Sequence, residues 1–302
     1  MKKILVTGPD SMLGKAVIPL LVNYNVISLP HSDTDLLNLK DTRISFFYNK
    51  PDIVLHLATY SGNVQFNQKY PSDTFLNSSL LNLNTLKAAQ ETGVQKIVSV
   101  MSSCCLEDNG DEVLYEDYLY SPPNKTVESH GYAKRLLNIG SNQIRLQYGI
   151  NAVTCIPQNM FGPNDNTNLN KTKVVMALIK RFVDAQRNND KSVTLWGSGI
   201  AKREFLYVED CAKALVQVIE NYNDPDPVNI TPGVETTIKE LAEKISSLVG
   251  FNGEIFWDTT KGDGQLRRRL SSAKMNKHLN LTFTPLEDGL RKTIEWYKKL
   301  EY

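Results

Sequence analysis

Short apolar runs rich in β-branched residues alternate along the chain with segments whose apolar positions recur every three to four residues. The short runs predict buried strands, and the recurring positions predict amphipathic helices. We expect strands at residues 3–7, 25–29, 52–58, 96–101 and 152–156. We expect helices at residues 15–21 and 77–92, and from Glu128 onward. Because strands and helices alternate, the pattern predicts an α/β protein with a right-handed, doubly wound parallel sheet.

The pattern loosens after Pro163, where a polar loop at residues 164–172 precedes a further helix. The last third of the chain predicts a smaller C-terminal α/β lobe. We therefore expect a large sheet domain over residues 1–165, to which residues 203–231 return. The smaller lobe is expected over residues 166–302 and would hold the substrate.

Composition excludes several classes of partner. The chain has 302 residues and a formal net charge of +1, which gives no support for binding nucleic acid or a membrane surface. No apolar run is long enough to span a bilayer, and Met1 leads into a strand without a signal peptide. The four cysteines have no metal-ligand spacing, so we expect no metal site. These features predict a protein of the cytoplasm.

A glycine-containing turn joins the first strand to the first helix. It runs from Gly8 to Gly14 and contains Ser11, Met12 and Leu13. A turn of this kind lets the backbone approach a dinucleotide pyrophosphate, whose charge lies at the helix N-terminus of a Rossmann sheet. Ser11 stands where such motifs have their middle glycine, and its hydroxyl is able to hydrogen-bond phosphate. An ordinary turn between strand and helix remains the alternative.

The end of the second strand bears on the choice of dinucleotide. An acidic residue there is typical of NAD sites, whereas this chain has Leu29-Pro30-His31-Ser32. The missing carboxylate favours NADP, with His31 and Ser32 as candidate contacts to its 2′-phosphate. That both are plain loop residues is an equal alternative.

The segment Glu128-Ser129-His130-Gly131-Tyr132-Ala133-Lys134 is the strongest candidate for chemistry. In a helix, His130 and Lys134 share a face, and Tyr132 points to nearly the opposite side. The strand at residues 96–101 delivers Ser102-Ser103-Cys104-Cys105 at its carboxyl end, the edge at which parallel sheets bind ligands. His56, inside a strand, is expected to be a hydrogen-bonded core residue.

These motifs resemble the extended short-chain dehydrogenase/reductases, and within them the GDP-L-fucose synthase family of epimerase-reductases. The resemblance covers nearly the whole chain. It rests on Ser102-Ser103-Cys104 and on residues 161–166, 195–199, 203–205 and 261–264. It implies NADP(H) as cofactor, a GDP-linked 4-keto deoxysugar as substrate, and a homodimer.

The resemblance also implies roles for individual residues. Ser102 falls on the serine that hydrogen-bonds the keto oxygen, Lys134 on the lysine that holds the nicotinamide ribose, and Cys104 on the base for epimerisation. The implied cofactor contacts are Gly8, Ser11, Met12, Leu13, Gly14, His31, Leu57, Ala58, Lys134, Pro157, Asn159 and Met160. The implied substrate contacts are Ser103, Asn159, Lys180, Trp196, Arg203, Asp263 and Arg267, with Arg268 as the alternative to Arg267. The alternative for the run Arg267-Arg268-Arg269 is that it forms a solvated surface with no ligand.

Two positions depart from the family pattern. His130 occupies the place of the catalytic tyrosine, and Lys173 the place of the histidine acid of the epimerase. Tyrosine donates a proton from a reference pKa of about 10, whereas histidine starts near about 6.5 and Lys134 would lower that value further. A neutral His130 is a poor proton donor, so we expect weak or acid-shifted reduction unless water or Tyr132 substitutes.

Epimerisation is expected to be reduced as well. Lysine has a reference pKa of about 10.4 and is a less suitable acid than histidine. Lys173 still provides a cation that would help to stabilise a Cys104 thiolate. The alternative is that Lys173 is an exposed lysine at the start of a helix.

Three functional interpretations follow. The leading one is an NADPH-dependent carbon-4 ketoreductase for a GDP-4-keto-6-deoxy-hexose or -heptose. A dehydratase of the same superfamily ranks lower, because Cys104-Cys105 stands where those enzymes carry an acidic pair. The third is a catalytically impaired homologue that binds NADP(H) and GDP-sugar without turnover.

Overall fold

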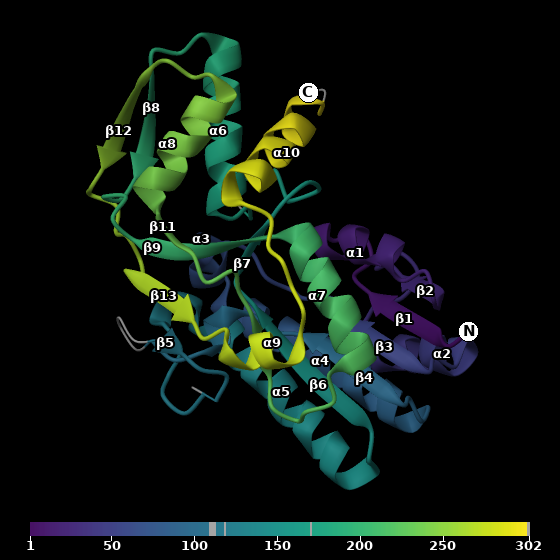
Figure 1. The fold of residues 1–302 in the computed structure, drawn as a ribbon. Coiled ribbons are helices and arrows are strands. Elements are labelled where there is room, and N and C mark those ends of the chain that lie inside the picture. The colour runs from purple at the N-terminus through teal and green to yellow at the C-terminus, as the bar shows by residue number, and fades with distance from the viewer. Residues whose placement is uncertain (109–112, 118, 170, 301–302) are drawn as a thin grey trace.

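A parallel six-stranded sheet lies at the centre of the larger lobe, in the lower part of Figure 1. The computed structural model describes residues 1–108, 113–117, 119–169 and 171–300. The strand order is β10-β6-β4-β3-β1-β2, and every adjacent pair is parallel. The strands are β1 (Lys3–Thr7), β2 (Asn25–Leu29), β3 (Ile53–His56), β4 (Lys96–Val100), β6 (Asn151–Pro157) and β10 (Val228–Ile230). The doubly wound sheet predicted from the sequence is confirmed.

Helices cover both faces of this sheet. One face carries α1 (Met12–Val17) and α7 (Val208–Asn221), and the other carries α2 (Leu39–Asn49), α4 (Pro71–Glu91) and α5 (Glu128–Tyr148). Successive strand residues point to opposite faces, so Ile4 and Val6 join one core while Leu5 joins the other. All three side chains are fully buried, as expected for a sheet covered on both sides.

The smaller lobe occupies the upper part of Figure 1. Helices α6 (Val174–Asn188), α8 (Ile238–Val249) and α10 (Leu286–Lys298) pack around a core that includes Phe182, Leu241 and Ile294. A two-stranded parallel sheet of β8 (Ser192–Trp196) and β12 (Glu254–Asp258) completes it. A reciprocal capping box between Thr237 and Glu240 begins α8, and Gly250 in the left-handed conformation ends it.

A second sheet joins the two lobes. It contains β11 (Glu235–Thr237), β9 (Lys202–Tyr207), β13 (Arg267–Leu270) and β5 (Val113–Leu114), with β7 (Asn159–Phe161) paired to β9. Glu204 is fully buried at this joint. One of its carboxylate oxygens accepts hydrogen bonds from Gln158 Nε2 (2.9 Å), Thr231 Oγ1 (2.8 Å) and the Leu270 backbone N–H (3.1 Å). Glu204 thereby ties the ends of β6 and β10 to β9 and β13.

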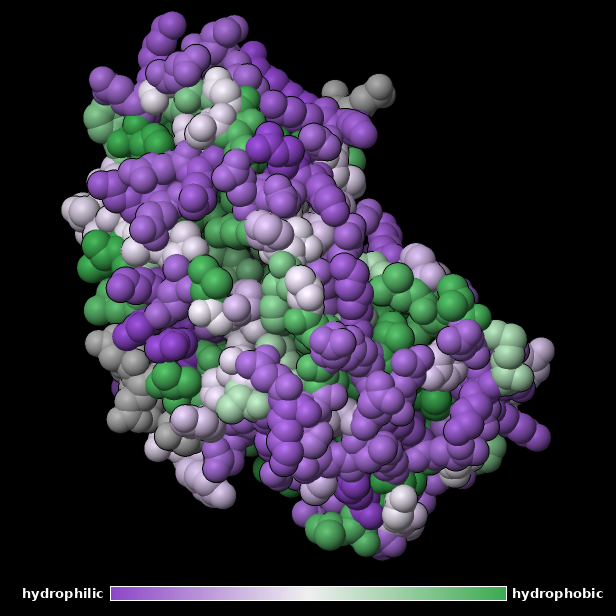
Figure 2. Space-filling model, in the orientation of Figure 1, coloured by the Kyte–Doolittle hydropathy of each residue, from purple (hydrophilic) through white to green (hydrophobic). Residues whose placement is uncertain are grey.

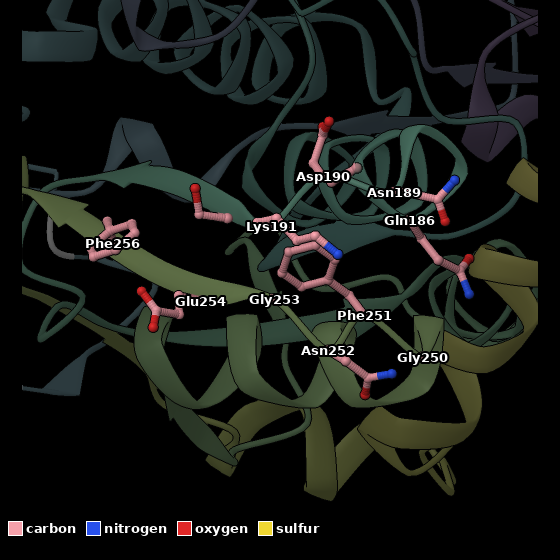
Figure 3. Close-up of a pocket in the computed structure, with 12 residues that line it drawn as sticks. Gln186, Asn189, Asp190, Lys191, Gly250, Phe251, Asn252, Gly253, Glu254 and Phe256 are labelled. Atoms are coloured by element: carbon pink, nitrogen blue, oxygen red, sulfur yellow. The ribbon is translucent and has the colours of Figure 1, made fainter.

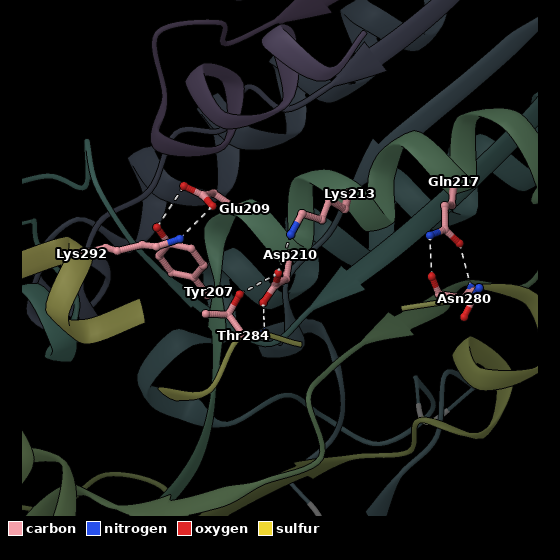
Figure 4. A network of polar contacts seen from close by, with 8 residues as sticks. All are labelled: Tyr207, Glu209, Asp210, Lys213, Gln217, Asn280, Thr284 and Lys292. Carbon is pink, nitrogen blue, oxygen red and sulfur yellow. Dashed lines mark hydrogen bonds and ion pairs between the residues drawn. The ribbon is translucent and has the colours of Figure 1, made fainter. Parts of the chain in front are cut away.

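The segment before α10 is fastened to α7, as Figure 4 shows. Asp210 is buried and accepts hydrogen bonds from the Thr284 backbone N–H (2.6 Å) and hydroxyl (3.0 Å). Gln217 and Asn280 exchange two further hydrogen bonds of 2.7 and 2.8 Å. These contacts hold the chain on the larger lobe until it turns up into α10.

One boundary differs from the expectation. Met275 and Leu279, from α9 (Ala273–His278) and just after it, lie in the core of the larger lobe, although the sequence assigns them to the range of the smaller lobe, 166–302. An amphipathic pattern shows that a segment has a buried face, but it does not show which lobe that face covers. The remaining short helices are α3 (Val64–Lys69) and the 3-10 turns Ile18–Leu20, Ser103–Cys105 and Lys125–Val127.

Candidate active site

The turn after β1 brings the backbone of three segments close together. Gly8 has a φ of +65°, and a Cβ there would lie 3.1 Å from the backbone of Ala58. A Cβ on Gly14 would lie 2.4 Å from the carbonyl oxygen of Pro9, so any side chain would displace the turn. Ser11 caps α1: its hydroxyl accepts from the Gly14 N–H (3.0 Å) and donates to the Gly8 carbonyl (2.8 Å). The hydroxyl that was expected to reach phosphate is therefore engaged in forming the turn.

Buried polar contacts fix the neighbouring turn at Leu57 and Ala58. Both backbone N–H groups donate to Thr7 Oγ1, at 3.1 and 3.2 Å. Thr7 Oγ1 also lies 2.8 Å from His56 Nδ1, and His56 Nε2 lies 2.9 Å from Asn82 Oδ1. His56 is thus the hydrogen-bonded core residue that the sequence predicted. Burial is the main cause that lowers the pKa of His56 to about 4, and the charge of Lys134 adds to it. The hydrogen bond to Asn82 opposes this shift.

The carboxyl end of β4 and the first turns of α5 form the centre of the site. Ser102 caps the short turn Ser103–Cys105, and its hydroxyl accepts from the Cys104 N–H at 3.3 Å. Gly131 lets α5 press against this turn, because a Cβ there would lie 2.5 Å from the Cys104 carbonyl oxygen. His130 and Lys134 are both buried, and Lys134 Nζ donates to the Val100 carbonyl at 2.8 Å.

Tyr132 does not enter this site. Its side chain is 38% exposed, and the guanidinium of Arg135 lies 5.6 Å from its ring. Arg135 in turn donates to the carbonyls of Cys105 and Ser121, both at 2.6 Å. Tyr132 therefore lies on the outer side of α5 and is not placed to substitute for the missing phenol.

Burial works against positive charge in this site. It is the main cause that lowers the pKa of His130 to about 3, and the charges of Lys134 and Lys173 add to the effect. His130 Nδ1 is buried and has no hydrogen-bond partner among the described residues. Burial also lowers the pKa of Lys134 to about 8, with Cys105 opposing and Lys173 reinforcing the shift. At neutral pH the site thus contains a neutral imidazole beside an ammonium group.

The two adjacent cysteines have opposite properties. Burial raises the pKa of Cys104, but Arg268, the Ser102 hydroxyl and Lys173 outweigh it and hold this pKa below its ordinary value. Cys105 is fully buried, and burial raises its pKa to about 12. All four cysteines are free thiols, and the described residues contain no cluster of three or more metal-ligating side chains. Cys104 is therefore the cysteine suited to act as a base.

Lys173 lies at the N-terminus of α6 and is exposed. Its positive charge acts on the pKa values of His130, Lys134 and Cys104, so Lys173 lies near the same site. Asp165 lies on this side too, with one buried carboxylate oxygen that lacks a hydrogen-bond partner among the described residues. Burial raises the pKa of Asp165, and the charge of Lys173 opposes this.

The remaining candidate cofactor contacts lie along one edge of the large sheet. Pro157 ends β6, and Asn159 and Met160 continue into β7 beside β9. Asn159 Nδ2 donates to the Glu204 carbonyl at 3.0 Å. His31 is exposed just beyond β2, while the Ser32 hydroxyl donates to Asp33 at 2.9 Å. His31 is therefore the freer of the two candidates for a 2′-phosphate.

Neighbouring arginines of β13 point in opposite directions. Arg267 forms two hydrogen bonds with Glu235, at 2.7 and 2.6 Å. Arg268 is 9% exposed, and its Nη1 lies 3.5 Å from both Cys104 Sγ and Ser103 Oγ. Of the two alternatives left open by the sequence, Arg268 is the one that faces the site.

The expected substrate residues of the smaller lobe have local partners. Arg203 donates to the carbonyls of Lys202 (2.7 Å) and Gln265, and burial followed by the charge of Arg268 lowers its pKa to about 10. Lys180 contacts Asp184 (2.8 Å) and the Tyr297 hydroxyl (3.1 Å). Asp263 accepts hydrogen bonds from the Ser198 N–H (2.7 Å) and hydroxyl (2.8 Å), which shapes the turn after β8. Trp196 is half exposed, with the Arg181 guanidinium 5.5 Å from its ring.

Sequence reasoning missed several residues that build this region. Glu204, Gln158 and Asn82 are buried hydrogen-bonding residues with no local sequence signal. Gln265 Nε2 donates to Asp108 Oδ1 at 2.6 Å, which joins the segment before β13 to the one that follows Cys105. On the face drawn in Figure 2 the surface is mostly hydrophilic, and apolar residues are scattered over both lobes and the region between them.

A separate groove of about 570 Å³ lies at the far end of the smaller lobe (Figure 3). It is lined by residues from the ends of α6 and α8 and from the starts of β8 and β12, including Gln186, Asp190, Phe251 and Phe256. None of the expected site residues lines it. It is therefore not part of the site formed around Ser102 and Lys134.

Comparison with known proteins places the chain in a family. Residues 4–231 match the NAD dependent epimerase/dehydratase family. A putative GDP-L-fucose synthase 2 of Arabidopsis thaliana is 35% identical, over 98% of this chain and 91% of that protein. A probable GDP-L-fucose synthase of Drosophila melanogaster is 33% identical, over 98% and 97%.

Solved structures give the same picture. A GDP-L-fucose synthetase from Naegleria fowleri bound to NADP has a TM-score of 0.89 at 29% identity, over 99% of this chain and 94% of that one. A GDP-mannoheptose C4 reductase from Campylobacter jejuni with NADP bound has a TM-score of 0.89 at 25% identity, over 99% of this chain and 98% of that one.

In the described part of this chain, no helix is long and apolar enough to cross a membrane. The chain belongs to the NAD dependent epimerase/dehydratase family, as one of its extended short-chain dehydrogenase/reductases.

Proposed function

We propose that this protein is an NADPH-dependent carbon-4 ketoreductase that acts on a GDP-linked 4-keto-6-deoxy-hexose or -heptose. One observation carries the proposal: the first turns of α5, with buried His130 and Lys134, pack against the end of β4, where Ser102 follows the strand. The similarity of the whole chain to GDP-L-fucose synthases and to a GDP-mannoheptose C4 reductase supports it. Nothing in these comparisons favours the alternative of a homologue that binds without turnover.

The residues of the first turn fit a dinucleotide. Gly8 and Gly14 pack closely on the backbone of Ala58 and Pro9, which holds the turn in shape. A glycine turn of this kind between strand and helix lets a pyrophosphate approach the backbone. Lys134 would hold the nicotinamide ribose, and His31 would lie near the 2′-phosphate. Bound NADPH supplies the hydride for the carbon-4 ketone.

The chain's own residues handle the ketone oxygen. The Ser102 hydroxyl would donate a hydrogen bond to it, and His130 stands at the position of the usual acid. A neutral imidazole donates a hydrogen bond but releases its proton poorly, because an anion would remain. We therefore expect reduction at carbon 4 to be slow, with the final proton limiting the rate.

Epimerisation at carbons 3 and 5 would need a base and an acid on opposite sides of the sugar ring. Cys104 suits the base, whereas Lys173 replaces the usual histidine acid. We expect inversion at one carbon at most. Solvent deuterium incorporated at carbons 3 and 5 measures proton removal, and the configuration of each carbon, assigned by NMR, measures inversion. Inversion at both carbons would contradict this expectation.

The decisive test of the function is incubation with NADPH and GDP-4-keto-6-deoxymannose or its heptose analogue. The expected result is NADPH oxidation with a carbon-4 hydroxyl in the product, identified by NMR. A Lys134→Met variant is the negative control. Binding of both compounds without oxidation of NADPH would support the impaired homologue instead.

A homodimer is the proposed assembly. Apolar side chains stay exposed along α4 and α5, which pack against each other. They are Phe75, Leu76, Leu80 and Leu83 on α4, and Tyr132, Ile139 and Leu146 at seven-residue spacing on α5. Seven-residue spacing forms one stripe, and two such helix pairs would cover each other. Analytical ultracentrifugation should give a dimer for the wild type and a monomer for Leu80→Glu with Ile139→Glu, whereas Tyr48→Glu on α2 should remain dimeric.

The proposed compartment is the cytoplasm. Three of the four free cysteines are fully buried, and Cys104 is only partly exposed. Free thiols persist in a reducing compartment. Fractionation of the source cells should place the protein with cytoplasmic markers.

A further inference from the structure

Arg268 is a buried cation that has no carboxylate partner in the part of the chain that the structure describes. Its side chain is 9% exposed. Among the described residues, its guanidinium contacts only a hydroxyl and a thiol, Ser103 Oγ and Cys104 Sγ, both at 3.5 Å. The neighbouring Arg267 is different, because Glu235 neutralises it. The positive charge of Arg268 is therefore not neutralised by a hydroxyl or a neutral thiol, and an anion beside it would stabilise it.

Burial of an unpaired charge is unfavourable, so the fold must gain from a negative charge beside Arg268. Two anions are able to supply it: the thiolate of Cys104, or a phosphate group of the substrate. The geometry favours the thiolate, because the guanidinium already lies next to the sulfur atom. The adjacent Cys105 does not supply a thiolate to Arg268, because it is fully buried and burial raises its pKa to about 12.

We propose that Arg268 is a positioning residue that stabilises the thiolate form of Cys104. Its guanidinium serves as the counter-ion of the sulfur, and Lys173 adds a second, more distant positive charge. Arg203 does not take this part, because its guanidinium donates to the carbonyls of Lys202 and Gln265.

The inference rests on the proposed function for its chemical consequence. The thiolate removes a proton from the carbon next to the ketone, so an S–H bond forms and a C–H bond breaks. The electron pair moves to the ketone oxygen, where the Ser102 hydroxyl donates to the resulting enolate. Return of the proton restores the thiolate, and no other reagent is consumed. Arg268 would thus preserve proton removal by Cys104, even though Lys173 stands where related enzymes have a histidine acid.

The test measures the reactivity of Cys104 without any substrate. Iodoacetamide alkylates thiolates, and Cys105, Cys155 and Cys211 are fully buried, so the modified residue should be Cys104. Cys104→Ser supplies the blank. In the wild type, the alkylation rate against pH should reach half its maximum below the usual thiol pKa of about 8.5.

Substitutions at Arg268 should move this profile. Arg268→Met should slow alkylation at pH 7 by about tenfold for each unit by which the thiol pKa rises above 7. Arg268→Lys should retain most of the rate, since the positive charge remains. Arg269→Met is the matched control, because Arg269 is the next residue of β13 and is exposed on the opposite face. Circular dichroism checks the fold of each variant.

Three results would overturn the proposal. One is a wild-type profile centred at or above the usual thiol value, which needs no variant. The second is an Arg268→Met variant whose Cys104 is alkylated as fast as in the wild type. If that variant also binds the GDP-sugar more weakly, Arg268 binds the substrate phosphate instead. The third is an Arg268→Lys variant as slow as Arg268→Met, which indicates a purely structural role. If the thiolate results hold but no deuterium enters a GDP-4-keto sugar, the proposed function fails and the role of Arg268 stands.

Discussion

His130 and Lys134 lie one turn apart on the buried face of α5, where burial favours the neutral form of each. The ammonium group of Lys134 is stabilised by the carbonyl of Val100, whereas His130 Nδ1 has no hydrogen-bond partner among the described residues. The lysine therefore keeps its proton near neutrality and the histidine does not. This relationship decides how the site is able to deliver a proton to a ketone.

The first prediction concerns the missing phenol. His130→Tyr should raise the reductase kcat near neutral pH by about tenfold or more, because a well-matched general acid contributes at least that much. The phenol would face the ammonium group of Lys134, which lowers a tyrosine pKa towards neutrality. NADPH oxidation by a GDP-4-keto sugar gives the rate. Tyr132→Phe should leave the rate unchanged, and a His130→Tyr variant no faster than wild type would show that residue 130 is not the acid.

The second prediction concerns Lys134 and alkaline pH. Its pKa is lowered from 10.5 to about 8, so its charge is present below that pH and is lost above it. If the ammonium group holds the nicotinamide ribose, kcat/KM for NADPH should fall as pH rises through about 8. Lys134→Arg should move this fall to higher pH, because arginine stays charged. A profile that is flat to pH 9 in the wild type would remove Lys134 from cofactor binding.

The sequence predicts the large sheet well because its strands are buried on both faces. A strand such as β4, whose five residues are all buried, is recognised from its β-branched residues Ile97, Val98 and Val100. It also predicts the edge where the site lies, since the residues that follow parallel strands gather there. These two facts bring the end of β4, which Ser102 follows, beside the start of α5, which carries His130 and Lys134.

The sequence does not predict contacts that depend on the register of short strands. β13 has four residues, three of them arginines, and only its pairing with β9 decides that Arg268 faces Cys104 while Arg267 meets Glu235. A glutamate next to an arginine is ordinarily expected at the surface, yet Glu204 is fully buried at the joint between the lobes. The dominance of burial over Lys134 in lowering the pKa of His130 likewise requires the fold.

The third prediction concerns the stability of the larger lobe. Lys96 Nζ donates to the carbonyls of Val218 (2.8 Å), Ile219 (2.7 Å) and Tyr222 (2.8 Å), and so satisfies the end of α7. Lys96→Met should lower the free energy of unfolding by about 2–3 kcal/mol, because the buried carbonyls lose a charged donor. Urea unfolding measures this. Lys87→Met on the exposed side of α4 should change it by less than about 0.5 kcal/mol, and an equal loss in both variants would contradict the capping role.

The last prediction concerns acid. The pKa of His56 is lowered from 6.5 to about 4, so the unfolded chain binds the proton more readily than the folded one. The stability that His56 contributes is complete above pH 6.5 and is lost as pH falls towards 4, by up to about 3 kcal/mol. His56→Gln should be less stable at pH 7, because hydrogen bonds to Thr7 and Asn82 are disturbed, but its free energy of unfolding should fall less steeply between pH 6.5 and 4. His31→Gln, at an exposed position, should keep the wild-type slope. Parallel curves for wild type and His56→Gln over this range would mean that protonation of His56 does not drive the acid sensitivity.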